Sequence, residues 1–260
     1  MPTAEVNGTD IAYADSGGDG PAVLLSHGFL MDHSMFDQQQ AALAPEFRVI
    51  TLDARGFGAT RAISAFSYWD LARDALGVLD HLGVDTAVLG GMSQGGFVSL
   101  RAALLAPERV RGLILLDTQA GQEDPAIAES YQQLEATWLE HGPGPVQELV
   151  ASIILGPVEW AEWFAKWAAQ DPAELTLAFR CLMDRDDVTG RLGEISCPAL
   201  VVHGTSDAAI PVALAEVLRA GLGGAAELLL IEGGSHAANL THPAQVNAAM
   251  LGFLRGLRSD

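Results

Sequence analysis

The sequence predicts an α/β fold in which a mostly parallel, twisted sheet carries helices on both faces and a helical insertion. Short, nearly continuous apolar runs alternate with segments of helical periodicity, which is typical of parallel strands that are buried on both faces. Residues 121–190 interrupt this alternation and contain helical patterns only. With 49% hydrophobic and 18% charged residues, the chain of 260 residues is expected to fold and to bury a sizeable core.

The strands can be placed in order along the chain. The first element is a hairpin, because Asn7 and Gly8 stand between two short alternating segments. Six apolar runs follow, and each leads through a turn into a helical segment. They occupy residues 22–26, 48–53, 86–91, 112–117, 199–204 and 226–231. Because parallel strands need crossover connections, we expect these runs to form the parallel part of the sheet.

Local signals mark the starts of several helices. Ser67 and Asp70 match a capping box at the start of the segment YWDLARDALGVLDHL. Pro211 and Pro243 each stand where a helix would begin, and proline is favoured in the first turn of a helix. We therefore expect one helix after Ser67 and one at each of these two prolines.

The interruption divides the chain into a core domain, residues 1–120 and 191–260, and a helical cap, residues 121–190. Ligand sites in open parallel sheets lie beyond the carboxyl ends of the strands. An insertion that leaves after the strand ending at Asp117 would cover that edge. The cap is therefore expected to act as a lid.

The cap contains Trp160, Trp163 and Trp167 at helical spacing. Such a stripe usually packs against a core, and it can also line a substrate pocket. These three tryptophans are the candidate pocket residues, and in that role they would favour apolar groups of the substrate.

Charge and composition exclude several classes of partner. The net charge of −19, from 14 basic and 33 acidic residues, disfavours nucleic acid and anionic membrane surfaces. The N-terminus lacks the pattern of a secretory signal, and no apolar run approaches the roughly 18 residues that cross a bilayer. A cytoplasmic protein is therefore expected, with Cys181 and Cys197 as reduced thiols. Neither cysteine has neighbours of metal-ligand type, and no metal or organic cofactor is predicted.

The stretch VLGGMSQGGFVSL places Ser93 between an apolar run and a helical segment. Gly91, Ser93 and Gly95 form the pattern Gly-x-Ser-x-Gly, which makes a sharp turn from strand to helix and holds the hydroxyl clear of the sheet. The backbone strain in such a turn costs roughly 1–3 kcal/mol. A purely structural serine would be an unusual occupant, so we interpret Ser93 as a nucleophile.

A serine nucleophile needs a base, and His236 is the candidate among seven histidines. It lies in IEGGSHAANL, a glycine-rich loop that leaves the last predicted strand from the same edge as Ser93. The alternative is a loop histidine that is only locally hydrogen-bonded. His27 and His203 end strands and are interpreted as structural. The remaining four are interpreted as surface or packing residues: His33, His81, His141 and His242.

The third member of a triad must be a carboxylate that orients the imidazole. Asp207, in HGTSDAAIP, and Asp117 both follow strands at the correct edge. We favour Asp207, because the order Ser93, Asp207, His236 is the order expected when the serine occupies such a turn. Asp117 is expected instead to cap the turn that enters the lid.

The negative charge of an oxyanion intermediate needs backbone donors. Gln94, the residue after the nucleophile, supplies one N–H. Phe29, in the HGF segment after the first parallel strand, is the best candidate for the other. His27 and Gly28 would then set the shape of this loop.

These segments together resemble the α/β-hydrolase family. HGFLMDHSMF, DARGFGAT, GGMSQGG, HGTSDAAIP and GGSHAANLTHP match its familiar segments in order and spacing, and HAANLTHP is similar to the histidine loop of the 3-oxoadipate enol-lactonase group and of small esterases. The resemblance implies an α/β-hydrolase fold, and it implies a structural turn for Asp53 and Arg55. Gln94 departs from relatives that often carry Met, and its side chain would reach the pocket or a neighbouring helix.

The predicted function is hydrolysis of an ester or lactone of a small, largely apolar substrate through an acyl-enzyme. Carbon–carbon bond hydrolysis and perhydrolysis use the same triad and stay open. A ligand receptor that keeps the triad and turns over slowly is a third alternative. Dehalogenase and epoxide hydrolase chemistry is disfavoured, because those relatives carry Asp where this chain carries Ser93.

Overall fold

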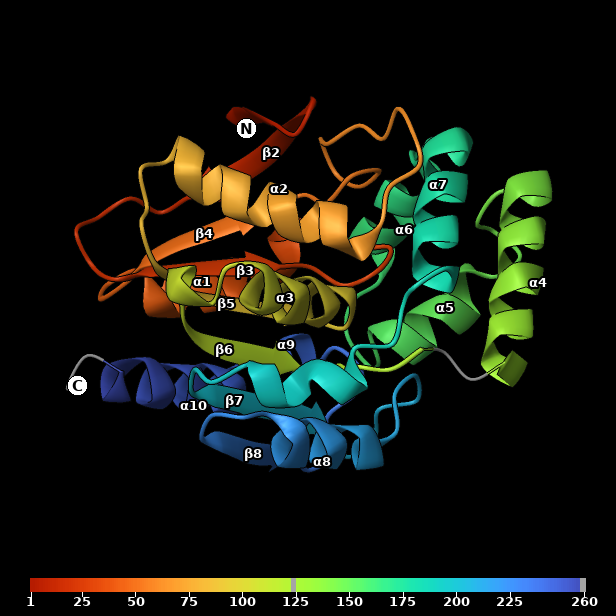
Figure 1. Cartoon of the computed structure of the whole chain (residues 1–260). Helices are drawn as coiled ribbons and strands as arrows, with labels where there is room; N and C mark the ends of the chain where they lie inside the picture. Colours follow the sequence, from red (N-terminus) through yellow and green to blue (C-terminus); the bar gives the residue numbers. More distant parts are fainter. Residues whose placement is uncertain (123–124, 258–260) are drawn as a thin grey trace.

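The computed structural model describes residues 1–122 and 125–257. Its centre is an eight-stranded sheet in the order β1-β2-β4-β3-β5-β6-β7-β8 (Figure 1). The strands are β1 Thr3–Val6, β2 Thr9–Asp15, β3 Ala22–Ser26, β4 Arg48–Leu52, β5 Ala87–Met92, β6 Val110–Leu116, β7 Ala199–Gly204 and β8 Ala226–Ile231. The pairs β1–β2 and β2–β4 are antiparallel, and every later pair is parallel. The mostly parallel α/β sheet predicted from the sequence is confirmed.

The N-terminal hairpin forms where it was predicted. Asn7 and Gly8 have φ angles of 48° and 74°, the left-handed values that a tight two-residue hairpin turn requires. The side-chain amide of Asn7 also donates to Asp74 at 3.0 Å, and Asp74 lies in the helix beneath the hairpin. This bond ties the edge of the sheet to the layer of helices.

The six parallel strands are those predicted, with small shifts at their ends. The central strand β5 is buried along its whole length, as expected for a strand with neighbours on both sides and helices on both faces. The run predicted at 112–117 is β6 and begins two residues earlier, where Val110 pairs with Ala87 of β5. Asp117 lies just beyond its end.

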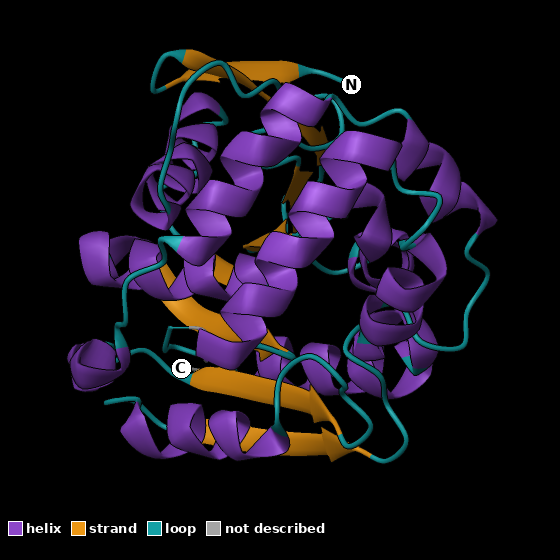
Figure 2. Ribbon diagram, turned by 90° about the vertical axis from the view of Figure 1, so that its right-hand side faces the viewer, coloured by secondary structure: helices purple, strands orange, loops and turns teal. Residues whose placement is uncertain are grey.

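Helices flank the sheet on both sides (Figure 2). In the core they are α1 Asp37–Leu43, α2 Tyr68–His81, α3 Gln94–Leu105, α8 Val212–Gly221, α9 Ala238–Thr241 and α10 Pro243–Gly256. Short 3-10 helices span His33–Phe36 (η1) and Pro107–Arg109 (η2). The capping box of Ser67 and Asp70 is present, and Pro243 is the first residue of α10. Pro211 instead caps α8 in an extended conformation one residue before the helix.

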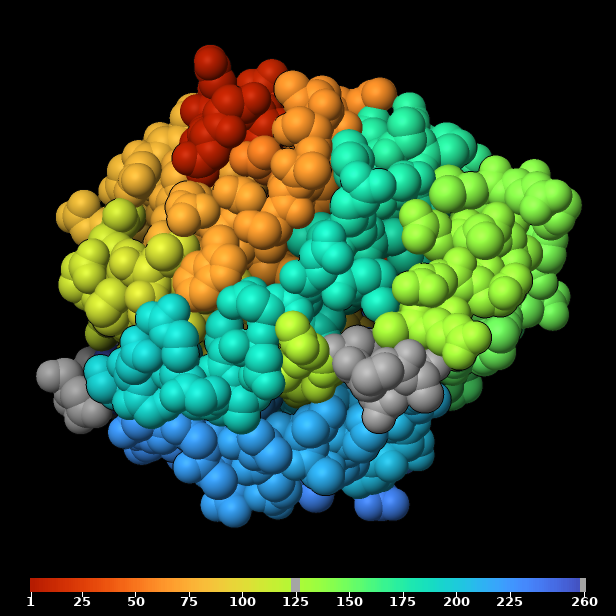
Figure 3. Space-filling view, turned by 45° about the vertical axis from the view of Figure 1, so that its right-hand side comes forward, coloured from red at the N-terminus to blue at the C-terminus, as the bar shows by residue number. Residues whose placement is uncertain are grey.

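Residues 121–190 contain four α-helices and no strand among their described residues. These are α4 Pro125–His141, α5 Gln147–Ile154, α6 Ala161–Ala168 and α7 Pro172–Met183, and the 3-10 helix η3 Thr189–Glu194 follows. Figure 1 shows the four α-helices gathered on one side of the sheet, on the right. The surface view shows cap residues in teal against the orange segment that follows β4 (Figure 3). The exact domain limits stay a prediction.

Two further sequence expectations concern exposure to membranes and redox state. Among the described residues, no helix is both long and apolar enough to cross a membrane. Cys181 is buried and Cys197 is half-buried, and both are free thiols. Burial raises the pKa of the Cys181 thiol to about 12, which makes it a poor nucleophile.

Candidate active site

Ser93 occupies the turn between β5 and α3. Its φ and ψ are 52° and −114°, a conformation that side-chain-bearing residues rarely adopt, and α3 begins at the next residue. Its N–H donates to the Leu116 carbonyl at 2.9 Å, and its carbonyl accepts from the Thr118 hydroxyl at 2.7 Å. The end of β6 therefore holds the strained backbone on both sides, as a sharp strand-to-helix turn requires.

The two glycines of the pattern allow this turn to close. A Cβ on Gly91 would overlap the backbone of Gly95, and a Cβ on Gly95 would overlap the carbonyl oxygen of Ser26. The contacts are with backbone atoms, which cannot rotate away. The strand and the helix can therefore approach each other only with glycine at both positions.

His236 and Asp207 form a hydrogen-bonded pair at the carboxyl ends of β7 and β8. His236 Nδ1 lies 2.8 Å from Asp207 Oδ2. The other carboxylate oxygen, Oδ1, accepts from the N–H groups of Ala209 and Ile210 at 2.8 and 2.9 Å. Burial by itself would raise the pKa of Asp207, but the nearby His236 and these bonds hold it well below its ordinary value. The carboxylate stays charged and fixes the imidazole.

A second histidine contacts the same carboxylate oxygen. His203 Nε2 lies 3.2 Å from Asp207 Oδ2 and 2.9 Å from the carbonyl of Ile210. Burial alone would lower the pKa of His203, but Asp207 and the nearby Asp117 raise it overall. Sequence reasoning set this residue aside as structural. Its only signal was its position four residues before Asp207 at a strand end.

Asp117 has a different role from the one expected. Its carboxylate accepts from the N–H of Gly204 at 2.7 Å and from the N–H of Ala238 at 3.3 Å. It therefore ties the end of β7 to the loop that follows His236, and it does not cap the turn into the lid. Complete burial raises the pKa of Asp117 to about 7. The structure thus pairs His236 with Asp207, the acid that we favoured.

The two expected oxyanion donors have free N–H groups. Within the described residues, no group accepts a hydrogen bond from the backbone N–H of Phe29 or from that of Gln94. His27 shapes the Phe29 loop as expected. Its Nε2 accepts from the Ala54 N–H at 2.9 Å, so the other ring nitrogen carries the proton and donates to the Gly28 carbonyl at 2.7 Å. Burial lowers the pKa of His27, which keeps the ring neutral.

The side chain of Gln94 points to a neighbouring helix. Its Oε1 accepts from the Tyr68 hydroxyl at 3.3 Å, across to α2. Its Nε2 is buried and has no hydrogen-bond partner among the residues that the structure describes. A small void that Gln94 lines together with Ser26 and Val98 lies on the same side. The departure from Met at this position therefore changes the packing behind the turn.

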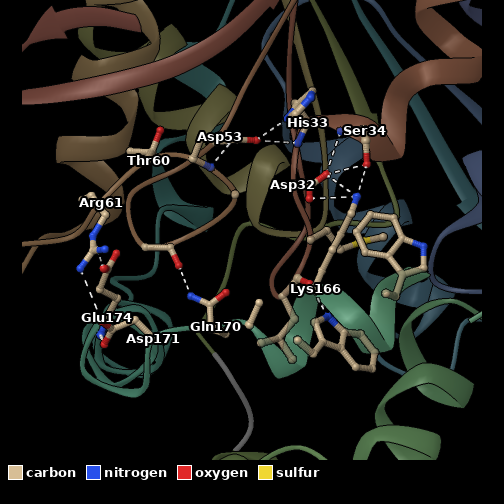
Figure 4. Close-up of a pocket in the computed structure, with 18 of the residues that line it drawn as sticks. Asp32, His33, Ser34, Asp53, Thr60, Arg61, Lys166, Gln170, Asp171 and Glu174 are labelled. Atoms are coloured by element: carbon tan, nitrogen blue, oxygen red, sulfur yellow. Dashed lines mark hydrogen bonds and ion pairs between the residues drawn. The ribbon is translucent and has the colours of Figure 1, made fainter. Parts of the chain in front are cut away.

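A cavity of about 540 Å³ lies between the cap and the loops after β3 and β4 (Figure 4). Ser93, Asp207 and His236 are not among the residues that line it. Of the three candidate tryptophans, Trp163 and Trp167 line this cavity. Trp160 does not, and its indole N–H donates within the cap to the Gly156 carbonyl at 2.8 Å. A substrate-pocket role for the three residues stays a prediction.

Polar groups in this cavity are already paired with one another (Figure 4). Asp32, His33 and Asp53 have the spacing of metal ligands. His33 Nδ1, however, lies 2.7 Å from Asp53 Oδ1, and Asp32 accepts from Ser34 and contacts Lys166 at 3.0 Å. Asp53 also accepts from the N–H groups of His33 and Ala59, at 2.8 and 2.9 Å, and its role as a structural turn residue stays a prediction.

Comparisons with known proteins cover most of the chain. A sequence model described as alpha/beta hydrolase fold matches residues 21–158, more than half of the chain, and a model described as TAP-like protein matches residues 183–259. The acetyltransferase component of the acetoin cleaving system of Pseudomonas putida is 34% identical over 97% of this chain and 68% of its own length.

Two solved structures resemble the whole chain. One is a thermophilic esterase from Thermogutta terrifontis, 29% identical over 98% of both chains, with a TM-score of 0.89. The other is the enol-lactonase from Burkholderia xenovorans LB400, 27% identical over 98% of this chain and all of its own, with a TM-score of 0.88. These matches, together with the sheet and the strained serine turn, show that the chain belongs to the α/β-hydrolase fold family.

Proposed function

We propose that this protein is a serine hydrolase that cleaves an ester or lactone bond of a small, largely apolar substrate through an acyl-enzyme. The observation that carries the proposal is the bond from His236 Nδ1 to Asp207, because it leaves Nε2 as the nitrogen that can take a proton from Ser93. Asp117 supports the same arrangement, because it joins the end of β6, beside Ser93, to the loop after His236.

Each step of the proposed reaction has a residue assigned to it. Ser93 Oγ attacks the carbonyl carbon while its proton passes to His236 Nε2. The carbonyl oxygen becomes an oxyanion that accepts hydrogen bonds from the N–H groups of Phe29 and Gln94. The intermediate expels the alcohol, which takes the proton from His236, and the acyl group stays on Ser93. Water then attacks the acyl carbon with His236 as base, the bond from that carbon to Ser93 Oγ breaks, and His236 returns the proton to Ser93 as the acid leaves; from a lactone, the product is a hydroxy acid.

The preference for apolar substrates rests on the surroundings of the proposed oxyanion hole. Phe29, one of the two donors, and the residues that follow it, Leu30 and Met31, are buried and apolar, and so is Met92, two positions before the other donor. Side chains of this kind favour an uncharged acyl group or ring and provide no partner for a charged one. The esterase and the enol-lactonase named above are consistent with this class of bond.

The test is turnover on p-nitrophenyl esters of graded chain length and on a lactone panel, with products identified by mass spectrometry. Fast multiple turnover, together with labelling of Ser93 by a fluorophosphonate, supports the proposal. A single slow covalent event would indicate a receptor instead. Turnover of carbon–carbon or peracid substrates alone would move the assignment to another reaction of the same fold.

A further inference from the structure

The cap contacts the loop of the proposed oxyanion hole through one buried indole. Trp167, in α6, donates from Nε1 to the carbonyl of Leu30 at 2.6 Å. Leu30 directly follows Phe29, and both Trp167 and Leu30 are buried. The two residues are 137 positions apart in the chain, so this bond joins the cap to the core.

The loop that receives this bond is strained. The Met31 N–H donates to the Gly28 carbonyl at 3.2 Å, which closes a four-residue turn with Phe29 and Leu30 at its centre. Leu30 has a φ of 62°, in the left-handed region that turns of this kind normally fill with glycine or asparagine. A leucine in this conformation needs its surroundings to hold it. The Trp167 bond to the Leu30 carbonyl supplies such a constraint, one residue from the Phe29 N–H.

The residue before Trp167 holds the same loop at a second point. Lys166 Nζ lies 3.0 Å from the Asp32 carboxylate and 2.6 Å from the Ser34 hydroxyl (Figure 4). Its ammonium also lies 4.4 Å from the centre of the Trp163 ring. Two consecutive residues of α6 therefore anchor residues 30–34, and Lys166 is the only lysine of the chain.

We infer that Trp167 is a positioning residue that holds the Phe29 N–H in place for the oxyanion, with Lys166 as a second anchor. The inference rests on the proposed function. In this inference the cap affects the chemical step, because it holds the backbone of the oxyanion loop in the core. This role is in addition to covering the site. Donors in an oxyanion hole act only when they are preorganised, so a looser loop should lower the rate of reaction more than the affinity for substrate.

The test compares Trp167→Phe with Trp69→Phe. Both variants lose an indole N–H that bridges distant segments, because Trp69 Nε1 donates to Asp186 at 3.0 Å, away from the oxyanion loop. We expect Trp167→Phe to lower kcat on p-nitrophenyl esters about tenfold, with KM within about twofold, and to weaken inhibition by an acyl trifluoromethyl ketone by a similar factor. Trp69→Phe should leave kcat and inhibition unchanged.

A second readout does not depend on activity. Amide hydrogen exchange of residues 28–34 should be faster in Trp167→Phe than in the wild type and unchanged in Trp69→Phe. If the wild type turns over no ester or lactone, the proposed function fails, while the exchange still reports on the anchor. Equal kcat and equal exchange in both variants would overturn the inference.

Lys166→Met keeps the apolar stem of the side chain and provides a second variant if Trp167→Phe does not fold. It should accelerate exchange in the same segment and lower kcat by a smaller factor. A Lys166→Met protein with wild-type kcat and wild-type exchange would count against the anchor.

Discussion

The loops at the carboxyl edge of the sheet and the helices of the cap differ in how their side chains are held. In the loops, Asp207 accepts from two N–H groups within three residues of itself, Ser93 is held by the end of β6, and His236 is held by the Asp207 carboxylate. In the cap, the polar contacts of Trp167 and Lys166 reach residues more than 130 positions away. The core site is held by neighbouring strand ends of the sheet, and the contribution of the cap depends on contacts between its helices and distant loops.

This difference suggests that the core loops and the cap helices have different roles in the reaction. The core loops carry the groups that form and break bonds, and the cap helices set the shape and order of what surrounds them. Variants in the loops should then remove activity while the protein stays folded. Variants in the cap should change stability, loop order or substrate preference.

The largest effect is expected from Ser93→Ala. Loss of the nucleophile should reduce kcat by about 10⁴-fold or more, as in other serine hydrolases, while the melting temperature changes little because the turn keeps its backbone bonds. Steady-state kinetics and thermal denaturation measure the two quantities. Appreciable activity in this variant, or probe labelling at another serine, would remove Ser93 from the mechanism.

The next effect separates the two carboxylates. Asp207→Asn should lower kcat by up to about 10⁴-fold, because an amide at Oδ2 no longer favours the imidazole tautomer with Nε2 free. Asp117→Asn should lower it far less, because Asp117 bonds backbone N–H groups and not His236. The reverse ranking would make Asp117 the acid of the triad.

The same contrast explains what could be read from the sequence. The hairpin at Asn7, the helix start at Ser67 and the turn at Ser93 follow from short patterns whose geometry is local, and all three are present. The pair of His236 and Asp207 also follows from the order of strand ends. The three short patterns need no knowledge of distant contacts, and the pair needs only that the strands before its two residues end at the same edge of the sheet.

The features that were missed depend on tertiary packing. Asp117 was expected to cap a turn, but it bonds β7 and the loop after β8, which approach it only in the folded sheet. His203 is the exception, because it lies only four residues before Asp207 and contacts the Asp207 carboxylate through the local turn after β7. No local pattern predicted the bond from Trp167 to Leu30, since helical spacing shows which face of a helix a tryptophan lies on but not which residue it contacts.

A smaller effect, on stability, is expected from the buried charge of Asp117. Burial raises its pKa to about 7, so the folded protein holds this proton more tightly than the unfolded chain does. The stability associated with this group is full below about pH 4 and is lost as the pH rises through about 7. Asp117→Asn removes the charge and keeps an acceptor for Gly204, at the cost of the weak bond from Ala238.

The difference in free energy of unfolding between Asp117→Asn and the wild type should therefore shift in favour of the variant as the pH rises from 4 to 8, by on the order of 3 kcal/mol. Denaturant unfolding of both proteins across this range measures the difference. A difference that stays constant with pH would mean that the Asp117 carboxyl does not change its protonation in this window.

The smallest expected effect separates the tryptophans of the cap. Trp163 lines the large cavity and stacks under the Lys166 ammonium, whereas Trp160 bonds within the cap and packs against Phe164 with ring centres 6.0 Å apart. If the cavity receives part of the substrate, Trp163→Ala should change the preference among p-nitrophenyl ester chain lengths by about tenfold, since one well-placed apolar contact contributes roughly 1–3 kcal/mol. Trp160→Ala should lower the melting temperature and leave the preference nearly unchanged.

Chain-length profiles and melting curves for both tryptophan variants measure these two effects, with fluorophosphonate labelling of Ser93 as the control for an intact site. Loss of stability in both variants with no change in either profile would make the tryptophan stripe a packing element, and the cap would then act on the reaction only through the loop that it holds.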